Sequence, residues 1–208
     1  MTQELVFYTH PMSRGRVVRW MLEEVGQPYR TELLDYGTTM KAPAYLAINP
    51  MGKVPAIRHG DTVVTECGAI CAYLADAFPA AGLAPAPGDL ARGTYYRWLF
   101  FGAGPVEAAV ANKMLGVEVP AERKPMVGCG SYAEMLDALE GAVRGSEYIA
   151  GNRFSAADVY LGMQIDFGLM FGTMEKRPAF ERYWSRISGR PAAKRARQID
   201  DALMPTKS

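Results

Sequence analysis

Strand-like segments occur only within the first 65 residues of this 208-residue chain, and every later segment with a regular pattern is helical. The last strand and the C-terminal helices are separated by one helix and then by Pro79–Gly88 (PAAGLAPAPG), whose composition is typical of a linker. We therefore expect an α/β N-terminal domain at residues 1–80, a linker at 81–88 and an all-α helical domain at 89–208.

The N-terminal domain should contain a βαβ unit followed by a ββα unit. Residues 4–9 and 29–34 resemble short strands, and the segment between them carries apolar residues at helical spacing over 14–25. Two strands joined by a helical crossover should be parallel. A hairpin at 54–64 and a helix at 66–78 complete the order βαβ-ββα.

Five helical segments are predicted for the C-terminal domain. Gly104-Pro105 should kink or interrupt the first, because proline cannot donate the helical hydrogen bond. Ser155 and Asp158 have the spacing of a capping box and are interpreted as structural. The predicted helices are 89–115, 131–143, 155–171, 178–187 and 191–203.

Composition excludes several classes of function. The 23 basic and 22 acidic side chains nearly balance, which argues against a nucleic-acid partner. Neither a membrane-spanning apolar run nor a signal peptide is expected, so we predict no membrane partner. Cys67, Cys71 and Cys129 form an odd set without metal-ligand spacing, which predicts no metal site and a reduced, cytoplasmic setting.

Pro55 interrupts the strand pattern of GKVPAI at residues 52–57, because it has no N–H for a sheet ladder. One interpretation is an edge strand, or a loop that enters a strand. The other is a cis Val54-Pro55 bond that turns the backbone of Val54 outward to bind an extended ligand.

The run INPMGKVPAI, followed by TECGAICAYL, resembles the central motif of cytosolic glutathione transferases, and Asp158 within NRFSAADVYLG resembles their C-terminal helix cap. The likeness extends from FYTHPMSRGR to the last helices and is strongest with bacterial, serine-type members. It implies a thioredoxin-like first domain and a cis Pro55. It also implies that Val54 pairs its backbone with the cysteinyl unit of glutathione.

The resemblance places the remaining glutathione contacts at the start of one helix and at the entry to the strand that follows Pro55. Cys67 begins a helix, where free N–H groups favour the γ-glutamyl carboxylate. Glu66 would bind the neighbouring ammonium and Lys53 the glycyl carboxylate, although each is also interpretable as an ordinary helix-start or surface residue. Most family members have Ser or Thr at the position of Cys67, so this thiol is either a substitute recognition group or a reactive thiolate.

Two hydroxyls are candidates for activating the glutathione thiol. Ser13 precedes the 14–25 helix, where the helix dipole and nearby Arg14 and Arg16 favour a thiolate. Tyr8 lies within the first strand, and a half-buried structural role is the simpler interpretation for it. We therefore predict Ser13 as the catalytic residue and keep Tyr8 as the alternative.

The resemblance implies a transferase that conjugates glutathione to small hydrophobic electrophiles in detoxification. Glutathione is then a co-substrate, no cofactor is tightly bound, and the protein is a homodimer. Met12, Trp98, Phe101 and Met170 are candidates for the acceptor pocket. The alternatives are a glutathione-dependent disulfide reductase or peroxidase that uses Cys67, and a non-catalytic member that binds hydrophobic ligands.

Overall fold

The computed structural model describes residues 3–204, and contacts divide the chain into two compact units. Within the described residues, the first unit comprises 3–81 and 190–204, and the second spans 82–189. All of the described strands belong to the first unit, whereas the second is built from helices. The expected combination of an α/β domain and an all-helical domain is therefore confirmed.

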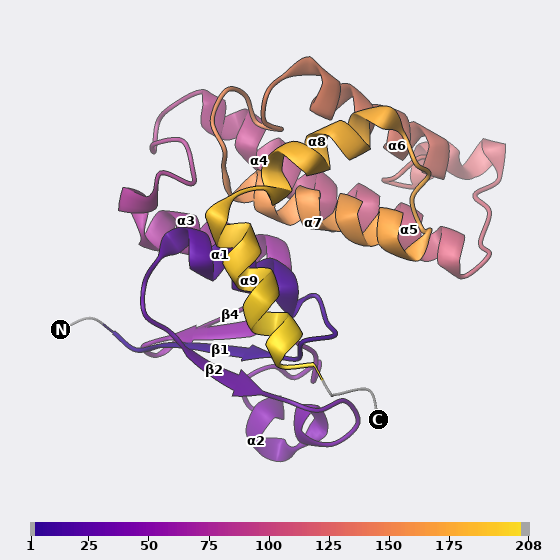
Figure 1. Cartoon of the computed structure of the whole chain (residues 1–208). Helices are drawn as coiled ribbons and strands as arrows, with labels where there is room; N and C mark the ends of the chain where they lie inside the picture. Colours follow the sequence, from indigo (N-terminus) through magenta and orange to yellow (C-terminus); the bar gives the residue numbers. More distant parts are fainter. Residues whose placement is uncertain (1–2, 205–208) are drawn as a thin grey trace. The chain divides into compact units, whose positions relative to one another are not determined.

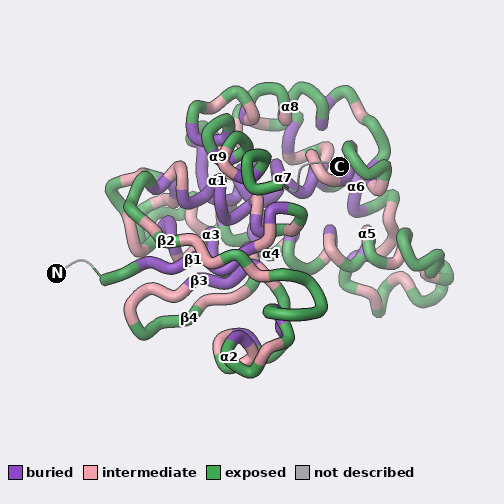
Figure 2. Tube along the Cα trace, turned by 60° about the horizontal axis from the view of Figure 1, so that its bottom comes forward, coloured by how far each residue is buried: buried purple, intermediate pink, exposed green. Residues whose placement is uncertain are grey.

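One four-stranded sheet forms the centre of the first unit (Figure 1). Its strands are β1 (Leu5–Thr9), β2 (Arg30–Leu33), β3 (Ala56–His59) and β4 (Thr62–Thr65), in the order β2-β1-β3-β4. The β1–β2 pair is parallel and the other two pairs are antiparallel, as the βαβ-ββα order predicts. Strand β1 is buried along its whole length (Figure 2).

Helices cover both faces of this sheet. Helix α1 packs its apolar side inward, with Val17, Val18 and Met21 fully buried. Helices α1 and α9 lie on one side of the sheet and α2 lies on the other (Figure 1). The helices of this unit are α1 (Gly15–Val25), η1 (Thr39–Lys41), α2 (Pro43–Leu46), α3 (Cys67–Ala77), η2 (Pro79–Ala81) and α9 (Pro191–Ala202).

The last helix packs with the first unit, although the sequence pattern had grouped it with the helical domain. Arg19 of α1 and Asp200 of α9 are both almost completely buried, and Nε lies 3.1 Å from Oδ1. The Arg19 guanidinium also stacks on the Phe7 ring, 4.9 Å from its centre. Burial raises the pKa of Asp200, and Arg19 opposes that effect. Removal of one partner would leave the other charge buried and unpaired, so this pair holds α9 in place.

The second unit is a set of packed helices around α7. Residues 156–165 of α7 are all buried, which makes this helix the core of the unit (Figure 2). The expected interruption at Gly104-Pro105 is a widened π-helical turn, which accommodates Pro105 without ending the helix. The elements are α4 (Ala91–Phe101), η3 (Gly102–Val106), α5 (Glu107–Met114), η4 (Ala121–Met126), α6 (Tyr132–Gly145), α7 (Ala156–Phe171) and α8 (Pro178–Ser188).

Candidate functional site

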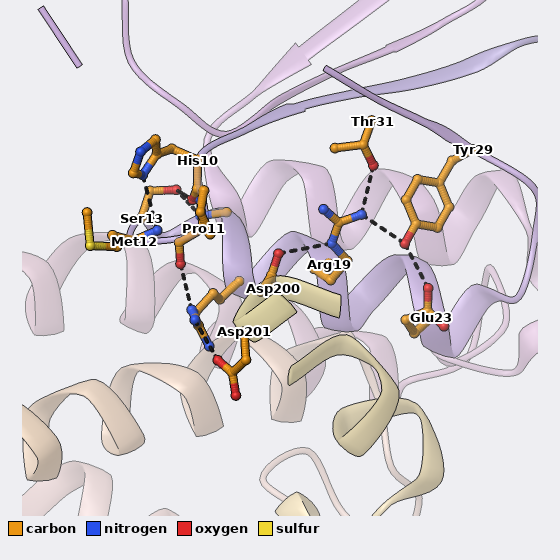
Figure 3. A network of polar contacts seen from close by, with 12 residues as sticks. His10, Pro11, Met12, Ser13, Arg19, Glu23, Tyr29, Thr31, Asp200 and Asp201 are labelled. Atoms are coloured by element: carbon orange, nitrogen blue, oxygen red, sulfur yellow. Dashed lines mark hydrogen bonds and ion pairs between the residues drawn. The ribbon is translucent and has the colours of Figure 1, made fainter. Parts of the chain in front are cut away.

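The hydroxyl of Ser13 forms hydrogen bonds that hold the loop between β1 and α1 (Figure 3). Ser13 Oγ donates to the His10 carbonyl at 2.6 Å and accepts the Gly15 N–H at 2.9 Å. Helix α1 begins at Gly15 with Arg14 as its N-cap, so Ser13 lies one residue before the N-cap position expected for it. Its oxygen still satisfies one of the N–H groups that the first turn leaves without an intrahelical partner.

Side chains hold the other carbonyls of this loop. Arg16 Nε donates to the Pro11 carbonyl at 2.7 Å, and the Tyr36 hydroxyl donates to that of Met12 at 3.3 Å. The Met12 N–H donates to His10 Nδ1 at 3.1 Å, and the His10 ring packs against Tyr36. The position of Ser13 is therefore set by hydrogen bonds on both sides of it.

Gly15 is required where α1 passes the end of β1. A Cβ atom at this position would lie 1.9 Å from Thr9 Oγ1 and 2.9 Å from Ser13 Oγ. Thr9 is fully buried, so it could yield only by disturbing the packing around it. Glycine therefore lets the start of the helix approach the strand closely enough for its N–H to reach the serine hydroxyl.

Tyr8 is a core residue of the sheet. Its side chain is 8% exposed and its ring packs against Tyr45, with 5.6 Å between ring centres. Burial raises the pKa of Tyr45 to about 12, and the protonated Tyr45 hydroxyl donates to the Lys53 carbonyl at 2.6 Å. These contacts give Tyr8 a packing role, whereas Ser13 is partly exposed in its loop.

The Val54-Pro55 bond is cis, as the family resemblance implied. Strand β3 begins at Ala56, so Pro55 precedes the strand and needs no ladder hydrogen bond. Val54 lies outside the paired residues of β3, and its backbone groups are not used by the ladder. The Lys53 carbonyl accepts from Tyr45 and from Asn49 Nδ2 at 2.8 Å, while the Lys53 side chain is exposed.

Glu66 has the one positive φ angle, 66°, found among the described non-glycine residues. It is the N-cap of α3, and its side chain is exposed. Backbone conformations of this kind are costly for residues with a Cβ atom and are frequent at functional sites. The strain fixes the direction in which the Glu66 carboxylate leaves the start of the helix.

Cys67 begins α3 beside the first turn of α1. Its Sγ lies 3.7 Å from the Arg14 carbonyl oxygen, so the N-terminal ends of the two helices are neighbours. Cys67 is partly exposed, whereas Cys71 one turn later is fully buried, and burial raises its pKa well above the usual value. Only the first of these thiols is accessible to a ligand at the helix ends.

The four candidate acceptor residues fall in both units. Met12 is exposed in the first unit; in the second, Trp98 is buried against Phe101, with ring centres 5.2 Å apart, and Met170 is exposed. An open hollow of about 400 Å³ in the second unit includes Phe101 in its lining. Its lining residues are Phe101, Pro105, Lys124, Pro125, Gly128, Cys129, Gly130, Glu134 and Met135. A single acceptor pocket formed by the four candidates stays a prediction.

Sequence reasoning missed the roles of Arg16 and Tyr36. Arg16 was interpreted as a source of positive potential, but it also binds the Pro11 carbonyl directly. The sequence pattern indicates no role for Tyr36, yet its hydroxyl donates to the Met12 carbonyl across 24 positions of the chain. Bonds from side chains to loop carbonyls depend on the path of the loop, which leaves no periodic signal in the sequence.

Residues 3–204 contain neither a cluster of metal ligands nor a helix that could span a membrane. No group of three or more His, Cys, Asp or Glu side chains in this part is arranged to hold a metal ion. No helix in it combines the length and the apolar character needed to cross a bilayer.

The first unit is a thioredoxin-like domain with a hydroxyl before α1 and a cis proline before β3, and the second is an added helical unit. Residues 7–82 match the family model for the N-terminal domain of glutathione S-transferase, and residues 127–191 match the model for its C-terminal domain. The chain belongs to the glutathione S-transferase family.

Relatives from plants are similar over most of the chain. Glutathione S-transferase F9 of Arabidopsis thaliana is 30% identical over 171 residues, which cover 74% of this chain and 77% of the relative. Glutathione S-transferase 3 of Zea mays is 27% identical over 201 residues, or 90% of each chain.

Solved bacterial structures share the fold. A glutathione transferase from Methylococcus capsulatus has a TM-score of 0.79 at 28% identity and covers 95% of this chain and 99% of its own. A sphingomonad glutathione S-transferase complexed with glutathione has a TM-score of 0.76 at 30% identity, with coverage of 94% and 98%.

Proposed function

We propose that this chain conjugates the thiolate of glutathione to small hydrophobic electrophiles. The observation that carries the proposal is the hydroxyl of the partly exposed Ser13, held at the start of α1 by the Gly15 N–H. A hydroxyl and a helix N-terminus at one point form a site that favours a thiolate over a thiol.

The chemistry requires that the thiol lose its proton before it attacks. A free thiol has a pKa of about 8.5, so most of it is protonated at neutral pH. The sulfur lone pair then attacks the electrophilic carbon and a C–S bond forms. The electrons of the broken bond leave with a halide, or take up a proton when an epoxide or enone reacts. Ser13 supports the first step because its O–H can donate to the sulfur anion.

Glutathione would lie along the edge formed by Val54 and the start of α3. Its cysteinyl amide would pair with the backbone of Val54 by strand addition. Its γ-glutamyl carboxylate would accept from the first N–H groups of α3 at Cys67, and Glu66 would bind the ammonium. Lys53, whose side chain is exposed, would reach the glycyl carboxylate.

Related structures support glutathione as co-substrate. The sphingomonad enzyme and a homologue from Sulfitobacter, at 30% and 28% identity, each contain glutathione. We extend glutathione binding to this chain because the backbone of Val54 and the N–H groups at the start of α3 are the hydrogen-bonding groups that glutathione needs. A homodimer and a detoxifying role are carried over from the family. Cys67, Cys71 and Cys129 form no disulfide within the described residues, which favours the reducing cytoplasm as the setting.

Steady-state assays with glutathione and a panel of halides, epoxides, enones and peroxides test this proposal. Conjugation of at least one of the first three classes should be saturable in glutathione and faster than the spontaneous reaction. Turnover confined to peroxides or disulfides would favour the reductase or peroxidase. Glutathione binding without any turnover would favour a ligand-binding protein.

Two substitutions at Glu66 distinguish the effect of its carboxylate on glutathione binding from the effect of its strained backbone on stability. Glu66→Ala should weaken glutathione binding by about 1.5–3 kcal/mol, the scale of hydrogen bonds to charged groups. Glu66→Gly removes the same carboxylate but relaxes a φ of 66°, so it should bind equally weakly while it stabilises the fold relative to the alanine variant. Calorimetric titration and thermal unfolding measure the two effects. An unchanged dissociation constant in both variants would remove Glu66 from the site.

Cys67→Ser distinguishes a recognition group from a redox thiol. A serine hydroxyl is a better hydrogen-bond donor than a thiol, so conjugation should stay equal or improve if Cys67 only contacts the carboxylate. Parallel assays of conjugation and of disulfide reduction measure the outcome, with Cys71→Ser as the buried control. Loss of disulfide reduction with conjugation intact would support the redox alternative.

A further inference from the structure

Ion pairs tie the last helix to α1 near the end that lies away from the Ser13 loop. Arg190, which precedes α9, makes a bidentate pair with Glu24, with both N–O distances at 2.7 Å. Arg195 Nε lies 3.1 Å from Glu23 Oε2. Both acidic residues are in the last turn of α1, so these pairs anchor α9 without touching residues 10–13.

Arg16 makes a different connection at the start of α1, to Pro11 and Asp201, which Figure 3 labels. Its Nε donates to the Pro11 carbonyl at 2.7 Å, and its Nη2 lies 2.8 Å from Asp201 Oδ1. One planar guanidinium therefore joins α9 to the loop. Lysine could not copy this contact, because it has one nitrogen and no fixed pair of donors.

The Pro11 carbonyl, which accepts from Arg16, directly follows in the chain the His10 carbonyl, which accepts from Ser13. Both the N–H and the hydroxyl of Ser13 donate to the carbonyl of His10, the residue before Pro11. A shift of Pro11 would turn the peptide group between His10 and Pro11 and would move the Ser13 hydroxyl with it.

We propose that Asp201 is a positioning residue for the thiol site: through Arg16 and the Pro11 carbonyl it fixes the position of the Ser13 hydroxyl oxygen. This inference rests on the proposed conjugation of glutathione. The connection brings the C-terminal helix into the transferase reaction, although Asp201 does not touch Ser13 itself. Its side chain is 56% exposed, so its effect should come from orientation of Arg16 more than from stability.

Electrostatics and positioning predict opposite results for Asp201→Asn. Loss of a negative charge near the site would favour the thiolate slightly and would raise turnover. Loss of the Arg16 orientation would misplace the hydroxyl and lower turnover, because small displacements of a catalytic group are costly. The direction of change therefore identifies the role.

The experiment measures kcat, the KM for glutathione and the thiolate absorbance of bound glutathione in Asp201→Asn, Asp201→Glu and Arg16→Lys. Asp201→Asn and Arg16→Lys should each lower kcat about three- to tenfold and reduce the thiolate fraction at neutral pH, with KM changed less than about twofold. Asp201→Glu keeps the carboxylate and should recover most of the loss. Arg195→Gln breaks an exposed pair on the same helix and should match the wild type.

The outcomes separate this inference from the proposed function. Equal or higher kcat in Asp201→Asn, or an equal loss in Arg195→Gln, would overturn the positioning role while leaving conjugation intact. If the wild-type protein binds glutathione without lowering the pKa of its thiol, the proposed function fails and the inference fails with it.

Discussion

Asp158→Ala is expected to lower the free energy of unfolding by about 3–4 kcal/mol, at the upper end of single-residue effects. The carboxylate is 0% exposed and accepts four hydrogen bonds at 2.7–2.9 Å. The donors are the Ile149 N–H, the Ser155 N–H and hydroxyl, and the Tyr183 hydroxyl. Alanine would leave these buried donors without an acceptor, which costs more than the hydrogen bonds themselves contribute.

Two matched variants resolve the contributions to this effect. Burial raises the pKa of Asp158, and the four donated hydrogen bonds oppose that effect. Asp158→Asn keeps the shape but turns one acceptor atom into a donor, so it should lose about 2–3 kcal/mol. Tyr183→Phe removes a single donor and should lose about 1 kcal/mol. Urea unfolding followed by circular dichroism measures all three. A loss below about 0.5 kcal/mol in Asp158→Asn would show that the network does not stabilise α7.

The spacing of Ser155 and Asp158 was enough to predict the capping box that opens α7. The bonds that Asp158 receives from Ile149 and Tyr183 were not predictable. A capping box depends on four consecutive residues, whereas these two partners reach it through the packing of a loop and of α8. Local sequence therefore predicted the cap and could not predict the network around it.

The docking of α9 shows the same limit over a longer range. The sequence pattern predicted a helix at 191–203, but that pattern does not say which part of the protein the apolar face of the helix packs against. The buried Asp200 meets Arg19 from a position 181 residues earlier in the chain. The same limit applies to the candidate site. The motif implied the cis Val54-Pro55 bond, but the contact of Asp201 with Arg16, which leads to the Ser13 loop, could not be predicted from the sequence.

Ser13→Ala is expected to raise the pKa of bound glutathione by about 1–2, equivalent to roughly 1.4–2.7 kcal/mol of lost thiolate stabilisation. In the structure, the Ser13 hydroxyl donates to the His10 carbonyl at 2.6 Å. A hydroxyl has one proton, so it must turn from His10 to the sulfur when glutathione binds. If the thiol in the variant titrates near the free value of about 8.5, the thiolate fraction at pH 7, and conjugation with it, should fall about eight- to twenty-five-fold, while the affinity for glutathione changes little.

Thiolate absorbance titrated against pH measures this change directly. Ser13→Thr keeps the hydroxyl and should retain most of the thiolate, whereas Tyr8→Phe should match the wild type because Tyr8 is packed in the sheet core. Alanine also leaves the Gly15 N–H without its acceptor, so thermal unfolding is recorded to separate a loss of stability from a loss of catalysis. An unchanged titration in Ser13→Ala with a large change in Tyr8→Phe would transfer the catalytic role to Tyr8. No change in either variant would leave the first N–H groups of α1 and the nearby arginines as the groups that stabilise the thiolate.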